Sequence, residues 1–444
     1  MENHSNDNLK VNHSVKKMNH EEKLKMYDID KRTAKLAIML AIFIDVLGYS
    51  MILPLLPTIA LKTFGATNFT IGLLIASNAL FAFIFAPIWG KLSDRYGRKP
   101  ILMISQAGTF AAFLVLGLSN SIEIVFYSRI LDGIFGGNIP VIRAYIMDIT
   151  DEKTRSAEIG KITAAMAFGM VFGPAIGGLL GILNWRYPVF VACSLSILTI
   201  ILTFKFLVES MPKKRVSDLR KRRKVMKEQN KDMNVLTKVV VLRLAELFLL
   251  IFAFIIINSS FPLVMTIRYN ANVVYIGLFA SIAGIILVIT GGLLIRPTIK
   301  KFGEKIMLLF ALLLAVAVFL IYPFLYEMWY LYIFIIPYMI SHIFTRSILM
   351  TNLSKAVDED KQGLVSGYAV NMMSIAQIIA PLLAYWYLEI WMVSYIGFNF
   401  DAYFLIGITC VFTILILLIL VLFDMKTYPE VFAKGEIDAE EFKN

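Results

Sequence analysis

Ionisable side chains inside long apolar stretches are the residues of this sequence best suited to chemistry. A charge near the centre of a lipid bilayer costs about 2.5–3.5 kcal/mol on insertion scales, so each such group needs a partner or a water-filled cavity. Burial disfavours the charged form of a carboxyl group and a nearby arginine favours it, so a carboxyl group under both influences can exchange protons. The candidates are Asp45, Arg129, Asp132, Arg143, Glu246, His342 and Arg346.

Several of these residues are compatible with more than one role. Glu246 follows Arg243 by three residues near the start of an apolar run, where an interfacial ion pair and a substrate contact fit the sequence equally well. His342 fits a packed or hydrogen-bonded residue better than a ligand. Arg346, one helical turn further, can contact an anionic substrate or extend toward the membrane surface. The residues expected to line a substrate cavity are Tyr49, Arg143, Glu246, Asn258, Tyr338, His342 and Arg346.

Twelve apolar runs must position these groups. A helix crosses the roughly 30 Å hydrocarbon layer with about 20 residues. The sequence therefore predicts an all-α membrane protein with twelve transmembrane helices. The runs lie at 36–61, 71–90, 101–119, 123–147, 159–183, 187–208, 241–266, 273–295, 306–325, 328–352, 363–388 and 400–423.

The distribution of lysine and arginine predicts the orientation of these helices. The loops on one side hold Lys62, Arg186 and Arg268, and every other loop Lys or Arg lies on the other side. Because cytoplasmic loops are enriched in these residues, both termini and the long loop 209–238 are expected in the cytoplasm of a multi-pass protein of the cell membrane. The basic loop can rest on anionic lipid headgroups, but a solvated linker is the favoured interpretation.

The composition excludes several classes of protein. Of 444 residues, 58% are hydrophobic and 17% are charged, against about 25% charged in ordinary soluble domains. Disorder and most soluble enzymes are therefore excluded. The net charge of +11 follows from the membrane topology, so nucleic acid is not an expected partner. Cys193 and Cys410 lie in apolar stretches and are expected to be buried thiols, and the polar N-terminus does not match a signal peptide.

Matches at nearly one offset indicate an internal repeat. The run Asp151–Lys153 recurs as Asp358–Asp360, and Pro174 recurs as Pro381, both at a shift of 207 residues. Two such six-helix bundles enclose a central cavity and can rock against each other. The predicted segments are a cytoplasmic tail 1–35, a bundle 36–208, a basic linker 209–240, a bundle 241–423 and a cytoplasmic tail 424–444.

The loop after the second predicted helix carries a specific motif. It reads G-x-x-x-D-R-x-G-R-K from Gly90, with Asp94, Arg95, Gly97 and Arg98 at the fixed positions. This motif resembles the signature of the major facilitator superfamily. The resemblance covers about residues 35–425 and implies that Asp94, Arg95 and Arg98 form a cytoplasmic latch, held by charge-assisted hydrogen bonds.

The partner expected for an arginine of this latch is Asp148, at the end of the fourth predicted helix. Ordinary anchoring at the membrane surface is the alternative for any single charge of the motif. In the second half of the chain, Lys300 replaces Asp94 and Glu304 replaces Arg98. A second latch is therefore expected to be degenerate.

Three helix motifs resemble the twelve-span drug/proton antiporter branch, which includes tetracycline and multidrug exporters. The fifth predicted helix matches its antiporter motif, G-x-x-x-G-P-x-x-G-G; the alternative is generic packing of small residues. In the first predicted helix, Asp45 precedes an L-G-x-x-x-x-x-P-x-x-P pattern, and Arg129 in the fourth begins an R-x-x-x-G-x-x-G pattern linked to proton coupling. Asp132 and Arg143 are unusual for the branch. The antiporter-motif residues are Gly169, Gly173, Pro174, Gly177 and Gly178.

The motifs and the ionisable groups together suggest a coupling mechanism. Asp45 or Asp132 would exchange its proton for a substrate, and Arg129 would tune the exchange; a static ion pair is the alternative. The sequence shows no phosphate-binding Gly-Lys-Ser/Thr loop. We therefore expect a secondary active transporter that exports small lipophilic or amphiphilic compounds by alternating access, driven by a proton gradient without a cofactor or bound metal.

Other functions remain open at this point. A major facilitator can carry a sugar, carboxylate or amino acid by symport or facilitation, and Arg143 with Arg346 favours an anionic substrate in that case. A scaffold or sensor that transports nothing fits less well, and no residue cluster supports an enzyme. The expected partners are a small-molecule substrate, protons and the lipid bilayer, and the resemblance implies a monomer.

Overall fold

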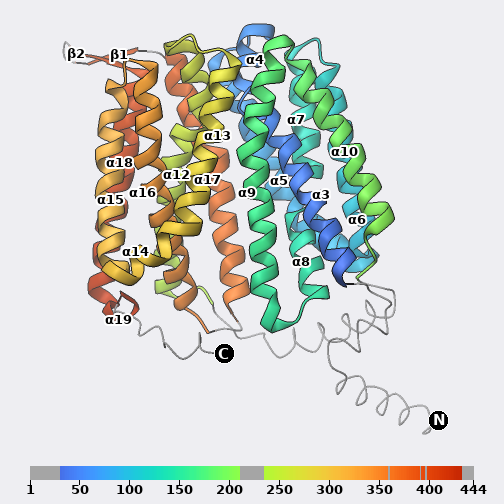
Figure 1. Cartoon of the computed structure of the whole chain (residues 1–444). Coiled ribbons are helices and arrows are strands. Elements are labelled where there is room, and N and C mark those ends of the chain that lie inside the picture. Colours follow the sequence, from blue (N-terminus) through green and yellow to red (C-terminus); the bar gives the residue numbers. More distant parts are fainter. Residues whose placement is uncertain (1–30, 211–234, 359–360, 391, 396–397, 433–444) are drawn as a thin grey trace.

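The computed structural model of the chain describes residues 31–210, 235–358, 361–390, 392–395 and 398–432. Within these ranges the chain is almost entirely helical, and most helices run between two faces of the molecule (Figure 1). We call the face where α3 begins and α18 ends the terminal face, and the other one the opposite face. Most of both predicted tails and most of the basic linker lie outside the described residues.

The first half of the chain supplies six spans, from α3 to α10. All are rich in apolar residues, and Thr67 caps α5 by accepting a hydrogen bond from the backbone N–H of Thr70. Pro57 lies in the first turn of α4, where the missing N–H of proline is harmless. The helices are α3 (Lys31–Ile52), α4 (Leu56–Phe64), α5 (Asn68–Tyr96), α6 (Arg98–Gly117), α7 (Ile122–Gly136), α8 (Ile139–Ile149), α9 (Glu152–Leu183) and α10 (Arg186–Phe206).

The second half supplies six more spans. A short antiparallel ribbon, β1 (Met392–Tyr395) with β2 (Phe398–Asp401), joins the last two at the opposite face. The helical elements are α12 (Lys238–Arg268), α13 (Val273–Ile289), η1 (Thr290–Leu294), α14 (Ile295–Phe302), α15 (Glu304–Ile321), η2 (Tyr322–Phe324), α16 (Met328–Lys355), α17 (Gln362–Ile390), α18 (Ala402–Thr427) and α19 (Pro429–Phe432).

The twelve-span prediction is confirmed, with two corrections. The predicted span 36–61 is two helices, because α3 ends at Ile52 and α4 begins at Leu56. Eleven helices in the described ranges are long and apolar enough to cross a membrane. The predicted span 123–147 is not one helix but two, because α7 ends at Gly136 and α8 begins at Ile139. Pro140 in the first turn of α8 cannot continue the hydrogen bonding of α7, which accounts for the break.

The two halves touch each other in the part of the molecule nearer the opposite face. There α5 packs against α17, and α9 packs against α13. Thr58 and Thr266 share a hydrogen bond of 2.6 Å across this boundary, and the Asn68 side chain donates to the backbone carbonyl of Leu388 over 2.8 Å. These contacts close the opposite face.

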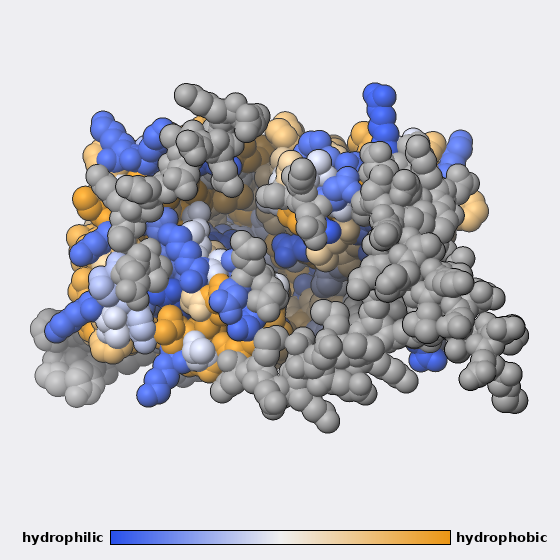
Figure 2. Space-filling model, turned by 90° about the horizontal axis from the view of Figure 1, so that it is seen from below, coloured by the Kyte–Doolittle hydropathy of each residue, from blue (hydrophilic) through white to orange (hydrophobic). Residues whose placement is uncertain are grey.

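The terminal face is hollowed toward its centre (Figure 2). The polar contacts that join the two halves within the described residues all lie toward the other end of the bundle. The molecule therefore has a central crevice that opens to the terminal face. This is the conformation that a two-bundle transporter adopts at one end of its rocking motion.

Candidate functional site

A small pocket in the first half contains two of the predicted ionisable residues. Asp45 on α3 and Arg143 on α8 line it together with the residues that follow the break in the fourth span. Thr199 and Gln106 also face the Asp45 carboxylate. The remaining lining residues, from α3, α8 and α9, are mostly apolar. The pocket therefore brings a carboxylate, a guanidinium and apolar surface together within the first half.

A second group of polar side chains lies on α7. Arg129 and Asp132 form a buried ion pair, with 3.4 Å between Arg129 Nη1 and Asp132 Oδ2. Asn78 on α5, which the sequence analysis missed, donates its side-chain N–H to Asp132 Oδ2 over 2.9 Å. Tyr49 lies one helical turn beyond Asp45 and within electrostatic range of this ion pair. These residues form a polar row between the pocket and α5.

Two predicted cavity residues are not at a cavity. Tyr338 is 2% exposed and packs among the rings of the second-half core, and its hydroxyl donates to the backbone carbonyl of Phe254 over 2.8 Å. Its prediction as a cavity residue is therefore wrong. Glu246 is fully buried in α12, and neither of its carboxylate oxygens has a hydrogen-bond partner among the described residues. Asn258, on the same helix, is exposed.

The partner of Arg243 is not Glu246. Arg243 makes two contacts with the Asp424 carboxylate on α18, Nε to Oδ2 at 3.1 Å and Nη2 to Oδ1 at 3.3 Å. Its third donor, Nη1, binds the backbone carbonyl of Asn352 over 2.7 Å. Both side chains are buried. This buried ion pair joins three helices of the second half and was not predicted, because its members are 181 residues apart.

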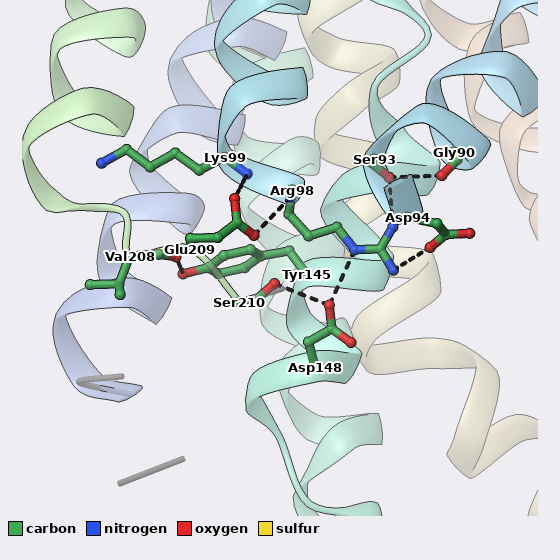
Figure 3. A network of polar contacts seen from close by, with 10 residues as sticks. All are labelled: Gly90, Ser93, Asp94, Arg98, Lys99, Tyr145, Asp148, Val208, Glu209 and Ser210. Atoms are coloured by element: carbon green, nitrogen blue, oxygen red, sulfur yellow. Dashed lines mark hydrogen bonds and ion pairs between the residues drawn. The ribbon is translucent and has the colours of Figure 1, made fainter. Parts of the chain in front are cut away.

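The latch motif forms a compact network at the junction of α5 and α6 (Figure 3). Arg98 Nη2 lies 2.7 Å from Asp94 Oδ1, and Arg98 Nε lies 3.1 Å from Asp148 Oδ2. Ser93 accepts a further hydrogen bond from Arg98 and donates to the carbonyl of Gly90. Arg95, which the motif also assigned to the latch, is exposed and faces the ring of Tyr96 instead.

The residues that follow α10 complete this network, and the sequence analysis missed them. The Glu209 carboxylate accepts hydrogen bonds from the backbone N–H groups of Arg98 and Lys99, at 2.8 and 3.0 Å (Figure 3). A negative charge at the N-terminus of α6 is favourable because the first N–H groups of a helix have no carbonyl partner within the helix itself. Gly97 has a φ of +106°, and a Cβ at this position would lie 2.5 Å from Glu209 Oε2, so glycine fits here best.

The second half carries an ion pair at the equivalent junction with the charges reversed. Glu304 takes the place of Arg98 and Lys355 takes the place of Asp148, and their side chains lie 2.9 Å apart. Gly303, like Gly97, has a positive φ, of 83°. The expected degenerate latch is thus an ion pair of opposite polarity. It is also more exposed than the first network: the Lys355 side chain is 40% exposed, and the Arg98 side chain is 7% exposed.

This difference in exposure predicts unequal effects of two matched substitutions. Arg98→Gln removes the cation that holds two carboxylates together and is expected to lower the free energy of unfolding by about 1.5–3 kcal/mol. Glu304→Gln removes one member of an exposed ion pair and is expected to cost about 1 kcal/mol or less. Unfolding of the purified protein in lipid–detergent micelles measures both. Equal losses would mean that the first network is no more than a surface ion pair.

Glycines of the predicted antiporter motif allow α9 to approach two helices closely. A Cβ at Gly173 would collide with the Ser50 side chain, and a Cβ at Gly177 would collide with the Met51 backbone. Ser50 and Met51 lie in the last turn of α3. Ser50 also donates a hydrogen bond to the carbonyl of Gly169 over 2.9 Å. On another side of α9, Pro174 and Gly178 meet Gly277 of α13, in the other half. The motif therefore packs α9 against its own half and across the boundary.

These features define a class of protein. Two halves of six spans enclose a crevice that is open at one face, and the first half holds a pocket with ionisable lining residues and a buried ion pair within its spans. Among the described residues, no group of three or more His, Cys, Asp or Glu side chains could hold a metal ion. The fold and the site are those of an integral, multi-pass membrane transporter.

The chain belongs to the Major Facilitator Superfamily, whose sequence profile matches residues 38–381. It is 29% identical over 380 residues to the tetracycline resistance protein, class H, of Pasteurella multocida, a match that covers 80% of this chain and 92% of that protein. It is 26% identical to multidrug resistance protein 2 of Bacillus subtilis (strain 168), over 80% of this chain and 88% of the relative. The resemblance inferred from the motifs is confirmed.

Solved structures of low sequence identity share the fold. A bacterial homologue of the human lysosomal transporter Spinster, in an inward-facing and occupied conformation, has a TM-score of 0.70 at 15% identity and covers 90% of this chain and 98% of its own. A D-xylose–proton symporter has a TM-score of 0.68 at 17% identity, covering 86% of this chain and 96% of its own. At these identities the comparisons concern the arrangement of the helices.

Proposed function

We propose that this protein is a proton-coupled exporter of small lipophilic or amphiphilic compounds that works by alternating access in the cell membrane. The relatives named as tetracycline and multidrug resistance proteins support this class of cargo. The observation that carries the proposal is the pocket of the first half, where the Asp45 carboxylate lies beside apolar surface. A proton and a lipophilic compound can both reach such a group.

The terminal face is proposed to be the cytoplasmic one. Among the described loops and helix ends, the opposite face has Lys62, Arg186 and Arg268, and the other Lys and Arg lie at the terminal face, as the positive-inside rule requires of a cytoplasmic side. The crevice in this structure is then open to the cytoplasm, where an exporter collects its cargo. The protein is proposed to act as a monomer, with both termini in the cytoplasm and without a cofactor.

The proposed cycle assigns different work to the two acidic groups of the first half. Asp132 is held by Arg129 and Asn78 and is nearly inaccessible, which suits a fixed ion pair that shapes the wall. Asp45 has no ion pair among the described residues and lines the pocket, which suits proton exchange. Protonation from outside and release of the proton to the cytoplasm would then alternate with cargo binding.

The Arg98 network is proposed to be the latch between conformations. Its members belong to α5, α6, α8 and the chain after α10, all in the first half, so the network would switch when these elements shift relative to one another as the halves rock. The two boundary helix pairs, α5 with α17 and α9 with α13, touch at their other ends. Rocking about those contacts would close the terminal face and open the opposite one.

Reconstitution in lipid vesicles tests the proposed function directly. A pH gradient is imposed, and the release of protons from the protein-containing vesicles is measured on addition of lipophilic compounds, sugars, small carboxylates or amino acids. Proton release driven by lipophilic compounds supports the proposal. A response confined to the polar metabolites would instead assign the protein to metabolite symport, and no response to any class would contradict transport coupled to protons.

A further inference from the structure

We propose that α16 carries an anion-binding site, built from Arg346, Thr345 and His342, which holds an acidic group of the transported compound. The inference rests on the proposed transport function and narrows its cargo to amphiphiles that carry a carboxylate, sulfonate or similar anion. The site lies on α16 in the second half of the chain, whereas the pocket that contains Asp45 lies in the first half.

Arg346 has a charge that the protein does not neutralise within its described residues. Its guanidinium Nη2 contacts the Met373 sulfur of α17 at 3.9 Å, and no carboxylate lies within ion-pair distance. Thioether sulfur is a weak acceptor. By contrast, Arg129 and Arg243, which are more deeply buried, each pair with an aspartate. A half-buried arginine at membrane depth without an acidic partner is suited to an anion that arrives with the cargo.

Two further polar groups of α16 share the same side of the helix. Residues 342, 345 and 346 are separated by three and four positions, so their side chains lie next to one another. Thr345 is fully buried and its hydroxyl has no hydrogen-bond partner among the described residues, and the same holds for the buried His342 Nε2. A guanidinium, a hydroxyl and an imidazole can all donate to one anion.

The internal repeat relates Arg346 to the pocket of the first half. The shift of 207 residues that relates the two halves maps Ile139 onto Arg346 and Met166 onto Met373. Ile139 and Met166 both line the pocket that contains Asp45. The contact between Arg346 and Met373 therefore occupies, in the second half, the position of the pocket wall in the first.

The surroundings of this position suit the apolar part of an amphiphile. The same shift maps Asp45 onto Phe252, so the second half has an aromatic ring where the first has a carboxylate. Phe252 stacks with Phe248 at a ring-centroid distance of 5.7 Å, and Phe252 and Met373 pack against the same core cluster. A guest can therefore place its acidic group on Arg346 and its apolar body against these rings.

Binding of two dyes that share a ring system but differ in charge tests the site. Fluorescein is an anion at neutral pH, and rhodamine 123 is a cation built on the same xanthene core. Full-length protein in lipid nanodiscs is titrated into each dye, and the affinity is read from fluorescence anisotropy. Arg346→Gln is expected to weaken fluorescein binding by about tenfold or more, because a charged hydrogen-bonding partner is lost. Rhodamine 123 binding should be unchanged or tighter.

Three further variants distinguish a loss of the anion site from a general loss of folded protein. Arg346→Lys keeps the charge and should fall between the wild type and Arg346→Gln, while Thr345→Val should weaken fluorescein binding by about threefold. Arg296→Gln removes an exposed cation from α14 in the same half and should change neither affinity. Fluorescein binding that is the same in the wild type, Arg346→Gln and Thr345→Val, or an equal loss for both dyes, overturns the proposed site.

Transport of the same dyes separates this inference from the proposed function. If fluorescein binds through Arg346 but a pH gradient moves neither dye, the anion site stands and proton-coupled export fails. If rhodamine 123 moves with the gradient while Arg346→Gln leaves fluorescein binding intact, export stands and the anion site is wrong.

Discussion

Asp45→Asn is expected to lower proton-driven transport by about tenfold or more, because the substitution removes the group that links proton binding to the movement of cargo. Asparagine has nearly the same shape, and its side-chain oxygen can still accept a hydrogen bond from Thr199 or Gln106. Downhill exchange of cargo in the absence of a pH gradient should therefore continue. The measurement is uptake into reconstituted vesicles with and without an imposed gradient.

Two other carboxylates serve as references for that result. Asp132→Asn should lower the stability of the protein more than its coupling, because it leaves the buried Arg129 without its acidic partner. Glu327→Gln removes an exposed carboxylate at the start of α16 and should have no effect. If Asp45→Asn and Asp132→Asn each retained full proton-driven transport, neither carboxylate could be the group that carries the proton.

Arg243→Met is expected to lower the free energy of unfolding by about 3–5 kcal/mol, the cost of leaving a buried carboxylate without its counter-charge. The affected carboxylate is that of Asp424 on α18, which is fully buried where α18 packs against α12. Loss of Arg243 also frees the backbone carbonyl of Asn352. Unfolding of the purified protein in mixed micelles, followed by circular dichroism, measures the change.

The double variant Arg243→Met with Asp424→Leu should recover most of this loss, since two apolar side chains of similar volume replace the ion pair as a unit. Lys238→Met, at the exposed start of the same helix, is the matched control and should change stability little. A double variant no more stable than Arg243→Met alone would show that charge compensation is not the reason for the loss.

The spans were predictable from the sequence because each needs one continuous apolar run, and that requirement is local. The break between α7 and α8 was not predicted, since the run 123–147 is long enough for one helix and Pro140 alone does not decide between a kink and an interruption. The position of the crevice follows from the repeat, because two similar bundles meet along an axis between them.

The partners of the charged residues were less predictable than the spans. Spacing of three residues suggested Glu246 for Arg243, but the arginine reaches Asp424 on another helix. Glu209 caps α6 from the far end of the first half, which no local pattern signals. The Arg98–Asp148 contact was predictable because the motif names one member and the end of a neighbouring span supplies the other. Charge pairing across helices depends on the packing, which a single sequence does not contain.

The reversed ion pair at the second junction bears on how the two halves diverged after duplication. Two junctions that begin alike can reach opposite polarity only through an intermediate in which the ion pair is lost, either to a neutral side chain or to two like charges. At Glu304 and Lys355 that intermediate is mild, because the pair is solvated and contributes about 1 kcal/mol or less. At Arg98, which is shielded and bound to two carboxylates, the same change is severe. Substitutions are therefore tolerated more readily at the Glu304–Lys355 junction than at the Arg98 junction. The second junction is thus the one where the rate of conformational switching can change at the lower cost in stability.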